Sequence, residues 1–363
     1  MKIKNIITVL LCAVFLFGMS AWCFSGQTPE YSESERRLLE GFPEVSWDKI
    51  SSGKFASEFE KYSTDRFPMR DTFRTIKAYA RLYGFMQKDN NDLFTADGHL
   101  SKVIYPHNPV MTDHATELFS TVRDKYFPNL DKDTENKIYL AVIPDKNRYL
   151  AADNGYLSLD YDEINTIIQE KMPYANYIEV SDLLSADDYY FTDTHWRQDK
   201  IVDVAERLKA EMNHKSSVEY KENIMPYDFN GVYVGQSALI VEPDTITYLT
   251  NDIIDNLVVE GANGVYDMTK VQSKDPYEMF LSGTQPVIKL TNPKNTTGDR
   301  LVIFRDSFGS SIAPLLVDAY SEVTLVDLRY VNSSILDMFV DFSDADVLFM
   351  YSTVLLNDSL SMK

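Results

Sequence analysis

The segment Leu301–Ser311 (Leu-Val-Ile-Phe-Arg-Asp-Ser-Phe-Gly-Ser-Ser) carries the strongest local signal for chemistry. An apolar, β-forming run leads into Asp306 and Ser307, and residues that suit a helix follow directly. A serine at such a strand-to-helix turn has its hydroxyl lifted above the sheet edge, where the first helical N–H groups can bind an oxyanion. The competing interpretation is a simple helix cap, because Asp and Ser both cap helices well.

The second signal is Phe191-Thr-Asp193-Thr-His195-Trp196. A serine nucleophile needs a base, and an imidazole base needs a carboxylate to fix its tautomer. Asp193 and His195 are two residues apart, so on an extended segment they project from the same side. Trp196 would shield the pair from water. The alternative is that Asp193 only caps the helix that follows Arg197, with His195 at the surface.

Metal chemistry is the other hypothesis for Asp193 and His195. Two ligands make no site without a third, and the sequence contains neither an HxxxH nor an HExxH pattern. We therefore expect no metal and no cofactor.

The elements around both motifs predict an α/β fold with a parallel sheet. Short apolar runs rich in β-forming residues alternate with segments of helical periodicity, and this alternation requires crossover connections. Open parallel sheets place active sites at the carboxyl ends of their strands. The expected strands are 137–143, 177–180, 300–304, 323–328 and 346–351, and the expected helices are 113–126, 164–172, 201–212, 309–320 and 335–340.

The other parts of the chain have different patterns. Residues 55–85 predict two helices separated at Phe67-Pro68, because the residue before a proline disfavours helix. Asn90-Asn91 and Asp97-Gly98 predict turns, with a short strand or a hairpin around Leu93 and Val103. We predict three parts: a leader at 1–26, a polar lead-in at 27–54, and one α/β domain at 55–363, which begins with helices and contains a β-rich insertion at about 217–290.

The leader has the charge order of an export signal. Lys2 and Lys4 precede an apolar, uncharged run that extends from Ile6 to about Phe24. Its length, about 19 residues, also suits a membrane span, so a cleaved signal and an uncleaved anchor both remain open. Both cysteines, Cys12 and Cys23, lie in this run, so the exported part has no thiol and no disulfide.

Composition and charge exclude several classes of protein. With 44% apolar and 25% charged residues, the chain is typical of a folded globular protein. Its 35 Lys+Arg and 55 Asp+Glu give a net charge of −20, which repels phosphate backbones and argues against a nucleic-acid partner. The same field disfavours broad docking on anionic lipid.

Taken together, Asp-x-His-Trp followed by a strand ending in Asp-Ser-Phe resembles the AlgX/AlgJ branch of the SGNH-hydrolase superfamily. The bacterial DHHW proteins, which are named for this motif, are similar. The resemblance extends over most of the exported chain in several short stretches: Ser34–Leu38, Phe42-Pro43, Gly53–Phe55, Asp65–Asp71, Asp228–Gly235 and Asp346–Asn357.

This resemblance implies an SGNH-like fold with permuted motif order and an exported polysaccharide O-acetyltransferase or esterase. On the matching positions, Ser307 is the nucleophile, His195 the general base and Asp193 the residue that orients it. The resemblance also implies a polysaccharide acceptor, an acyl donor and a membrane-bound O-acyltransferase as partner.

Four further residues are candidates at the site. The N–H of Phe308 is expected to help bind the oxyanion, and Arg305 stands where the family has glycine. Asn147 is the candidate side-chain oxyanion donor, with Lys146 beside it, although a solvated loop is the more ordinary interpretation of both. Trp196 is the fourth.

Two alternatives remain open beside the transferase. One is an esterase with the same triad. The other is a catalytically silent envelope-binding protein, which the unusual Arg305 keeps open. Tyr189, Tyr190, Tyr227 and Tyr233 would suit stacking on sugars if they are exposed, but core positions are the ordinary place for such residues.

Overall fold

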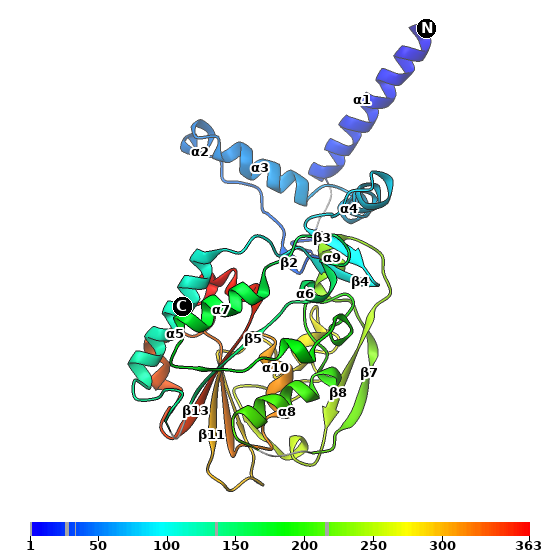
Figure 1. Cartoon of the computed structure of the whole chain (residues 1–363). Helices are drawn as coiled ribbons and strands as arrows, with labels where there is room; N and C mark the ends of the chain where they lie inside the picture. Colours follow the sequence, from blue (N-terminus) through cyan, green and yellow to red (C-terminus); the bar gives the residue numbers. More distant parts are fainter. Residues whose placement is uncertain (1, 26–28, 33, 135–136, 215–217) are drawn as a thin grey trace. The chain divides into compact units, whose positions relative to one another are not determined.

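A computed structural model describes residues 2–25, 29–32, 34–134, 137–214 and 218–363 (Figure 1). The chain divides into two compact units. The first comprises Met1–Asn91 and Val234–Val241, and the second comprises Asp92–Tyr233 and Glu242–Lys363. The expected part boundaries at residues 26–27 and 217 lie outside the described residues.

The second unit is built on a seven-stranded sheet, in the order β6-β5-β13-β11-β12-β10-β9. The first five strands in that order are parallel, whereas β10 and β9 are antiparallel to their neighbours. The predicted α/β class is therefore confirmed. The strands are β5 (Ile138–Ile143), β6 (Asn176–Tyr177), β9 (Val258–Glu260), β10 (Val287–Thr291), β11 (Arg300–Arg305), β12 (Glu322–Val326) and β13 (Ala345–Ser352).

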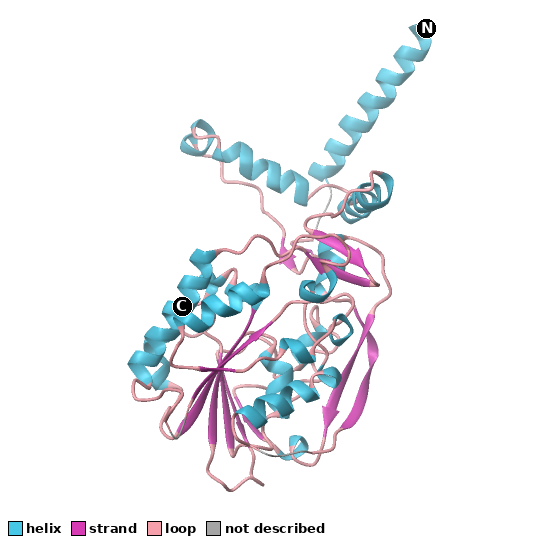
Figure 2. Cartoon of the chain, in the orientation of Figure 1, coloured by secondary structure: helices cyan, strands magenta, loops and turns pink. Residues whose placement is uncertain are grey.

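Helices cover both faces of this sheet (Figure 2). Side chains of α5 (Pro109–Tyr126) and α7 (Tyr161–Lys171) pack with one set of alternate strand residues, and those of α8 (Val202–Glu211) and α10 (Gly309–Ile312) pack with the other set. Because both faces are covered, all six residues of β5 are buried. This explains why the central strands appear in the sequence as continuous apolar runs.

Two predicted helices are wrong in length or type. The helix expected at 309–320 ends as α10 at Ile312 and continues only as a 3₁₀ turn, Ala313–Leu315, because Pro314 has no N–H to extend the helix. The helix expected at 335–340 is a 3₁₀ segment, Ser333–Met338. The remaining short helices of this region are α6 (Asn147–Leu150), α9 (Val232–Ser237) and α11 (Thr353–Leu356).

The expected β-rich insertion has two structural roles. Strands β7 (Lys221–Phe229) and β8 (Asp244–Thr250) form a separate antiparallel pair, whereas β9 and β10 extend the main sheet. The predicted hairpin is confirmed as β3 (Leu93–Ala96) and β4 (His99–Lys102). Its turn residues Asp97 and Gly98 both have positive φ, which favours the Asp-Gly pair.

The carboxyl edge of the main sheet collects the polar residues that follow β5, β11 and β13. β11 lies between β13 and β12 in the sheet. The chain passes from β11 to β12 on one side and then crosses back to β13 on the other side of β11. This is a topological switch point, where open α/β sheets bind ligands. Ser307 is the second residue after β11.

The first unit is largely helical. Among the described residues, α1 (Lys2–Ser25) is the one helix that is long and apolar enough to cross a membrane. The apolar segment is Ile3–Cys23. This suits a signal sequence or an anchor. The two helices expected between 55 and 85 are confirmed as α3 (Lys54–Asp65) and α4 (Arg70–Tyr79), the latter followed by a π-helical turn, Ala80–Gly84. The other elements are β1 (Tyr31–Ser32), β2 (Arg37–Leu38) and α2 (Trp47–Ser51).

Candidate active site

A short closed loop presents Asp193 and His195. Tyr189 pairs with Trp196 in an antiparallel bridge, and the N–H of Tyr190 donates to the carbonyl of His195 at 3.1 Å. The loop between these contacts is only a few residues long, so its backbone has little freedom. Both side chains are therefore held by a fixed frame.

The structure brings Asp193, His195 and Ser307 into one hydrogen-bonded line. His195 Nδ1 lies 2.6 Å from Asp193 Oδ1, and His195 Nε2 lies 2.8 Å from Ser307 Oγ. Because the carboxylate accepts the Nδ1 proton, Nε2 is left to accept the proton of the serine hydroxyl. This is the arrangement of a base and its nucleophile.

Asp193 is buried and charged. Burial alone would raise the pKa of Asp193, but the electrostatic attraction of a protonated His195 and the hydrogen bonds from His195 and Val232 outweigh burial and hold this pKa well below its usual range. The backbone N–H of Val232 donates to Oδ2 at 2.8 Å, and the backbone N–H of His195 donates to Oδ1 at 3.1 Å. The carboxylate is therefore ionised and fixed in orientation.

Gly231 allows the chain to pass directly over the Asp193 loop. A Cβ at Gly231 would lie 2.3 Å from the Thr192 carbonyl oxygen and 2.5 Å from Asp193 Cβ. The N–H of Gly231 also donates to Thr192 Oγ1 at 2.9 Å. Glycine is required here by the close approach, which brings the Val232 N–H within reach of the carboxylate.

A second carboxylate anchors the same loop from β8. Asp244, at the start of that strand, accepts hydrogen bonds from the N–H groups of Phe191 at 2.8 Å and Thr192 at 2.7 Å. It also accepts the Thr192 hydroxyl at 2.5 Å. Asp244 is not identifiable from the sequence, since nothing in its local pattern separates it from the other acidic residues.

Tyr277 lies flat against the imidazole and was also missed. The rings of Tyr277 and His195 are stacked, with centroids 3.8 Å apart and planes 8° from parallel. The Tyr277 hydroxyl donates to Ser311 Oγ at 2.9 Å, and burial raises its pKa well above the usual range, so it stays a neutral donor. Tyr277 thus covers one face of the imidazole.

The turn that carries Ser307 is held by Asp306. Its carboxylate accepts the Phe308 N–H at 3.0 Å and the Ser352 N–H at 2.8 Å, which ties the turn to the end of β13. The expectation that Phe308 offers a free N–H to an oxyanion is therefore wrong in this state. Among the described residues, the N–H of Ser307 has no acceptor, so it is the donor available beside the hydroxyl.

Arg305 fits the turn because Gly309 leaves space for it. A Cβ at Gly309 would lie 2.7 Å from Arg305 Cβ. The buried guanidinium donates to the Asp306 carbonyl at 3.2 Å and to Ser310 Oγ at 3.1 Å, and lies 3.7 Å from the Asp327 carboxylate. The guanidinium thus contacts the turn and Asp327, which directly follows the neighbouring strand β12.

Trp196 supports the turn from within the core. Its indole N–H donates to the Phe308 carbonyl at 3.2 Å and to Ser311 Oγ at 2.9 Å, and its ring meets Phe308 edge-on at 5.4 Å. It is fully buried. Trp196 therefore packs behind the site.

Asn147 and Lys146 are buried, so the solvated-loop interpretation is wrong. They follow β5 into the interior, where polar groups need partners. Asn147 Oδ1 accepts from Ser101 at 2.7 Å, and its amide nitrogen donates to the Lys102 carbonyl. This occupies the oxygen and one proton of the candidate oxyanion donor.

Lys146 supports the loop that carries Asp193. Its ammonium donates to the carbonyl oxygens of Tyr190 at 2.9 Å and Phe191 at 3.2 Å, and lies 5.2 Å from the centre of the Tyr233 ring. Burial lowers the pKa of Lys146 to about 7, against the opposing effect of Asp193 and other nearby carboxylates.

The tyrosines considered for sugar stacking are mostly core residues. Tyr189, Tyr190 and Tyr233 are buried, and only Tyr227, at 45% exposure, is open to solvent. Ser307 itself is half-buried, and His195 is 8% exposed. Ser307 is therefore the more accessible of these two side chains.

Several solved structures are similar in fold. A DHHW family protein from Eubacterium siraeum has 19% identity, covers 74% of this chain and 93% of its own, and gives a TM-score of 0.51. Bacillus cereus PatB1 has 15% identity, with 73% and 96% covered and a TM-score of 0.55. PatB1 with a sulfonyl adduct has 16% identity, with 73% and 97% covered and a TM-score of 0.53.

These similarities confirm the predicted resemblance at the level of the fold, because a DHHW protein is among the matches. No family model matches the sequence, and no curated relative matches it.

Proposed function

We propose that this protein is an exported SGNH-like acyltransferase that O-acetylates a cell-envelope or secreted polysaccharide. The observation that carries the proposal is the line of hydrogen bonds from Asp193 through His195 to Ser307, at the switch point of an α/β sheet. A half-buried serine bonded to a carboxylate-oriented imidazole is suited to nucleophilic catalysis.

In the first half-reaction, Ser307 Oγ attacks the carbonyl carbon of an acyl ester while His195 Nε2 takes the hydroxyl proton. The ionised Asp193 stabilises the imidazolium that forms. The Ser307 N–H, which has no acceptor among the described residues, is the donor we propose for the oxyanion. The tetrahedral intermediate expels the donor's alcohol, which takes the proton from His195, and an acetyl-serine remains.

In the second half-reaction, a sugar hydroxyl gives its proton to His195 and attacks the acetyl-serine. The second tetrahedral intermediate expels Ser307 Oγ, which recovers the proton from His195. The products are an O-acetylated sugar and the free enzyme. Water in place of the sugar gives hydrolysis, which is the esterase alternative. Because Ser307 is partly exposed to solvent, this alternative is retained.

Export and the polysaccharide acceptor are supported by sequence features outside the site. The apolar α1 suits an export signal or an anchor, and the motif resemblance described above is to a polysaccharide-modifying branch of the superfamily. A membrane-bound O-acyltransferase that supplies acyl groups is the partner we propose on the same ground.

Two measurements test the proposal. A sulfonyl fluoride should label Ser307, with the Oγ–sulfur bond replacing fluoride, and p-nitrophenyl acetate should be hydrolysed. Ser307→Ala should abolish both, whereas Ser321→Ala, a surface control outside the site, should not. Equal turnover by Ser307→Ala would sink both enzymatic functions and leave the silent envelope protein.

An oligosaccharide acceptor then separates transferase from esterase. If the protein is a transferase, mass spectrometry should show a product about 42 Da heavier than the acceptor, because an acetyl group replaces a hydrogen. Release of acetate alone, over a range of acceptors, would favour the esterase.

A further inference from the structure

The helix α4 of the first unit has an exposed apolar face. Along α4 and the π-helical turn, Phe73, Ile76, Tyr79 and Tyr83 recur every three or four residues, so they share one side, and Met69 directly precedes the helix. Their exposed fractions are 39–58%. A surface helix normally buries such a stripe and leaves its charged side in water.

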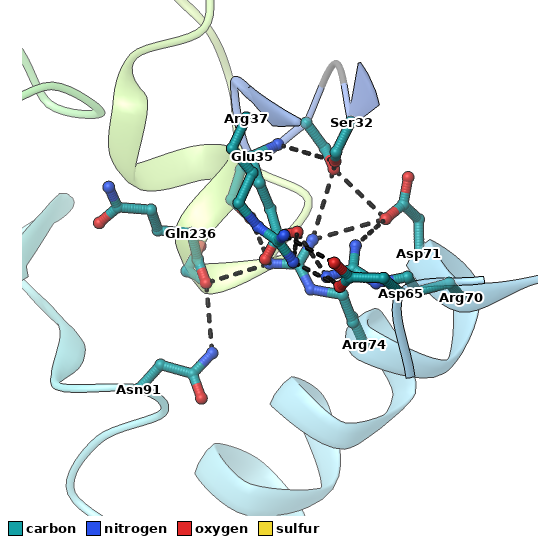
Figure 3. A network of polar contacts seen from close by, with 12 residues as sticks. Ser32, Glu35, Arg37, Asp65, Arg70, Asp71, Arg74, Asn91 and Gln236 are labelled. Atoms are coloured by element: carbon teal, nitrogen blue, oxygen red, sulfur yellow. Dashed lines mark hydrogen bonds and ion pairs between the residues drawn. The ribbon is translucent and has the colours of Figure 1, made fainter. Parts of the chain in front are cut away.

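The opposite face of α4 is charged and turned inward. The side chains of Arg70 and Arg74 are only 14% and 16% exposed. Both bind Glu35, at 2.5 Å and 3.2 Å (Figure 3). Arg74 also donates to the Gly235 carbonyl at 2.7 Å. Ala78, on the same side, is fully buried. The helix is therefore inverted relative to an ordinary surface helix.

The network that holds this orientation is extensive. Arg37 makes a two-pronged ion pair with Asp65, at 2.8 and 2.5 Å, and Arg70 lies 3.5 Å from the same carboxylate (Figure 3). Asp65 is only 6% exposed although Arg37 is 41% exposed, so removing the arginines would leave a buried charge uncompensated, which is destabilising. The exposed apolar face is thus fixed by the ion pairs behind it.

The neighbouring helix α3 shows the ordinary solution. Its apolar residues Phe55, Phe59 and Tyr62 are covered by Phe42 of the lead-in, with ring centroids 5.3–6.5 Å apart. On the face of α4, only Phe73 has an aromatic ring from outside the stripe against it among the described residues, that of Phe67 at 5.5 Å, and Ile76 and Tyr83 stay 57% and 58% exposed. The chain extends this face with Phe85 and Met86, which are 75% and 80% exposed. An apolar face of this extent marks an interaction site.

The end of α1 is continuous with this face. Cys23 of α1 and Phe73 of the stripe line one pocket of about 650 Å³, together with Phe59 and Phe67. Because α1 is long and apolar enough to span a bilayer, the nearest apolar medium for the stripe is the membrane that α1 enters.

The charge of the first unit permits this contact. It contains 13 Lys+Arg and 11 Asp+Glu, which is a net charge of +2. Because the whole chain carries −20, the remaining residues carry −22. The acidic field that disfavours docking on anionic lipid therefore belongs to the second unit. Within residues 54–88, eight basic residues accompany four acidic ones, which suits an anionic surface.

We propose that the outward face of α4, with Phe85 and Met86, lies in the head-group layer of the membrane that α1 enters. Tyr79 and Tyr83 suit this layer because tyrosine combines an apolar ring with a polar end. This contact would hold the first unit on the bilayer surface in addition to the anchor.

The test uses nitroxide labels on the full chain in vesicles of phosphatidylethanolamine and phosphatidylglycerol. Cys12 and Cys23 are replaced by serine, and single cysteines are placed at Ile76, Tyr83 or Phe85. Met338→Cys, in the second unit and 72% exposed, is the matched control. Collision rates are measured with oxygen, which concentrates in lipid, and with a water-soluble nickel chelate. Circular dichroism and sulfonyl labelling of Ser307 verify folding.

We expect labels on the stripe to collide with nickel several-fold less, and with oxygen more, than the label at Met338. Nickel access equal to that at Met338 would overturn the proposal. Protection from both reagents together with spin–spin broadening would also overturn it, because a second copy of the chain would then cover the stripe.

Discussion

Replacing Asp193 by Asn tests the proposed triad most sharply, because the change keeps the shape and removes the charge. Three donors point at this carboxylate: the ring and backbone N–H groups of His195 share Oδ1, and the Val232 N–H takes Oδ2. An amide nitrogen cannot accept a hydrogen bond. Asn must therefore oppose donor to donor at one of the two positions.

The number of donors decides the orientation of the amide. If the Asn nitrogen occupies the position of Asp193 Oδ2, the amide loses one hydrogen bond, from Val232. If the nitrogen occupies the position of Oδ1, the amide loses two, both from His195. Each buried loss costs about 1–3 kcal/mol, so the nitrogen should face Val232 and His195 should keep its tautomer. The remaining loss is that of the charge behind the imidazolium. Losing this charge should weaken transition-state stabilisation by about 2–3 kcal/mol, which lowers kcat/KM about 30–150-fold.

The assay is hydrolysis of p-nitrophenyl acetate, with ¹⁵N chemical shifts of the His195 ring to report the tautomer. Asp187→Asn is the matched control, because that carboxylate is 89% exposed. An unchanged rate in Asp193→Asn would refute the orienting role. A loss of about 10⁴-fold with a reversed tautomer would refute the count of hydrogen bonds, because that is the size expected when the wrong nitrogen carries the proton.

Three further predictions follow. Tyr277→Ala should lower kcat up to about tenfold with little change in KM, because the ring that stacks on the imidazole is lost. Tyr277→Phe keeps the ring and should keep most of the activity. An equal loss in both variants would assign the effect to the hydroxyl. Gly231→Ala should lower the free energy of unfolding in urea by about 1–3 kcal/mol, since its Cβ meets the Thr192 carbonyl; Gly41→Ala, with open space around it, is the control. Folding lowers the pKa of Lys146 from 10.5 to about 7. Between pH 7 and pH 10.5 the unfolded chain therefore binds more protons than the folded chain, and the free energy of unfolding should rise with pH. Unfolding in urea at pH 7 and about pH 9 should show this rise in the wild type and a smaller one in Lys146→Met; identical slopes would exclude Lys146 as the cause.

The sequence determined the elements whose signal is local. The strands β5, β11 and β13 appear as apolar runs because each is covered on both faces, and Asp97-Gly98 marks the β3–β4 turn because both residues have positive φ. Residue type and order also singled out Asp193, His195 and Ser307. The chemistry of a base and a nucleophile restricts the candidates to few residue types, and this chain has only five histidines.

Only the tertiary structure decided what surrounds those residues. Tyr277, Asp244 and the N–H of Val232 come from segments 37 or more residues away from His195, and no local pattern marks them. Burial decided the roles of Asn147 and Lys146, which look like loop residues until β5 carries them into the interior. Periodicity is a property of neighbours along the chain, whereas these contacts depend on which elements pack together. The sequence therefore identified the reactive groups, and the packing of distant segments decided their environment.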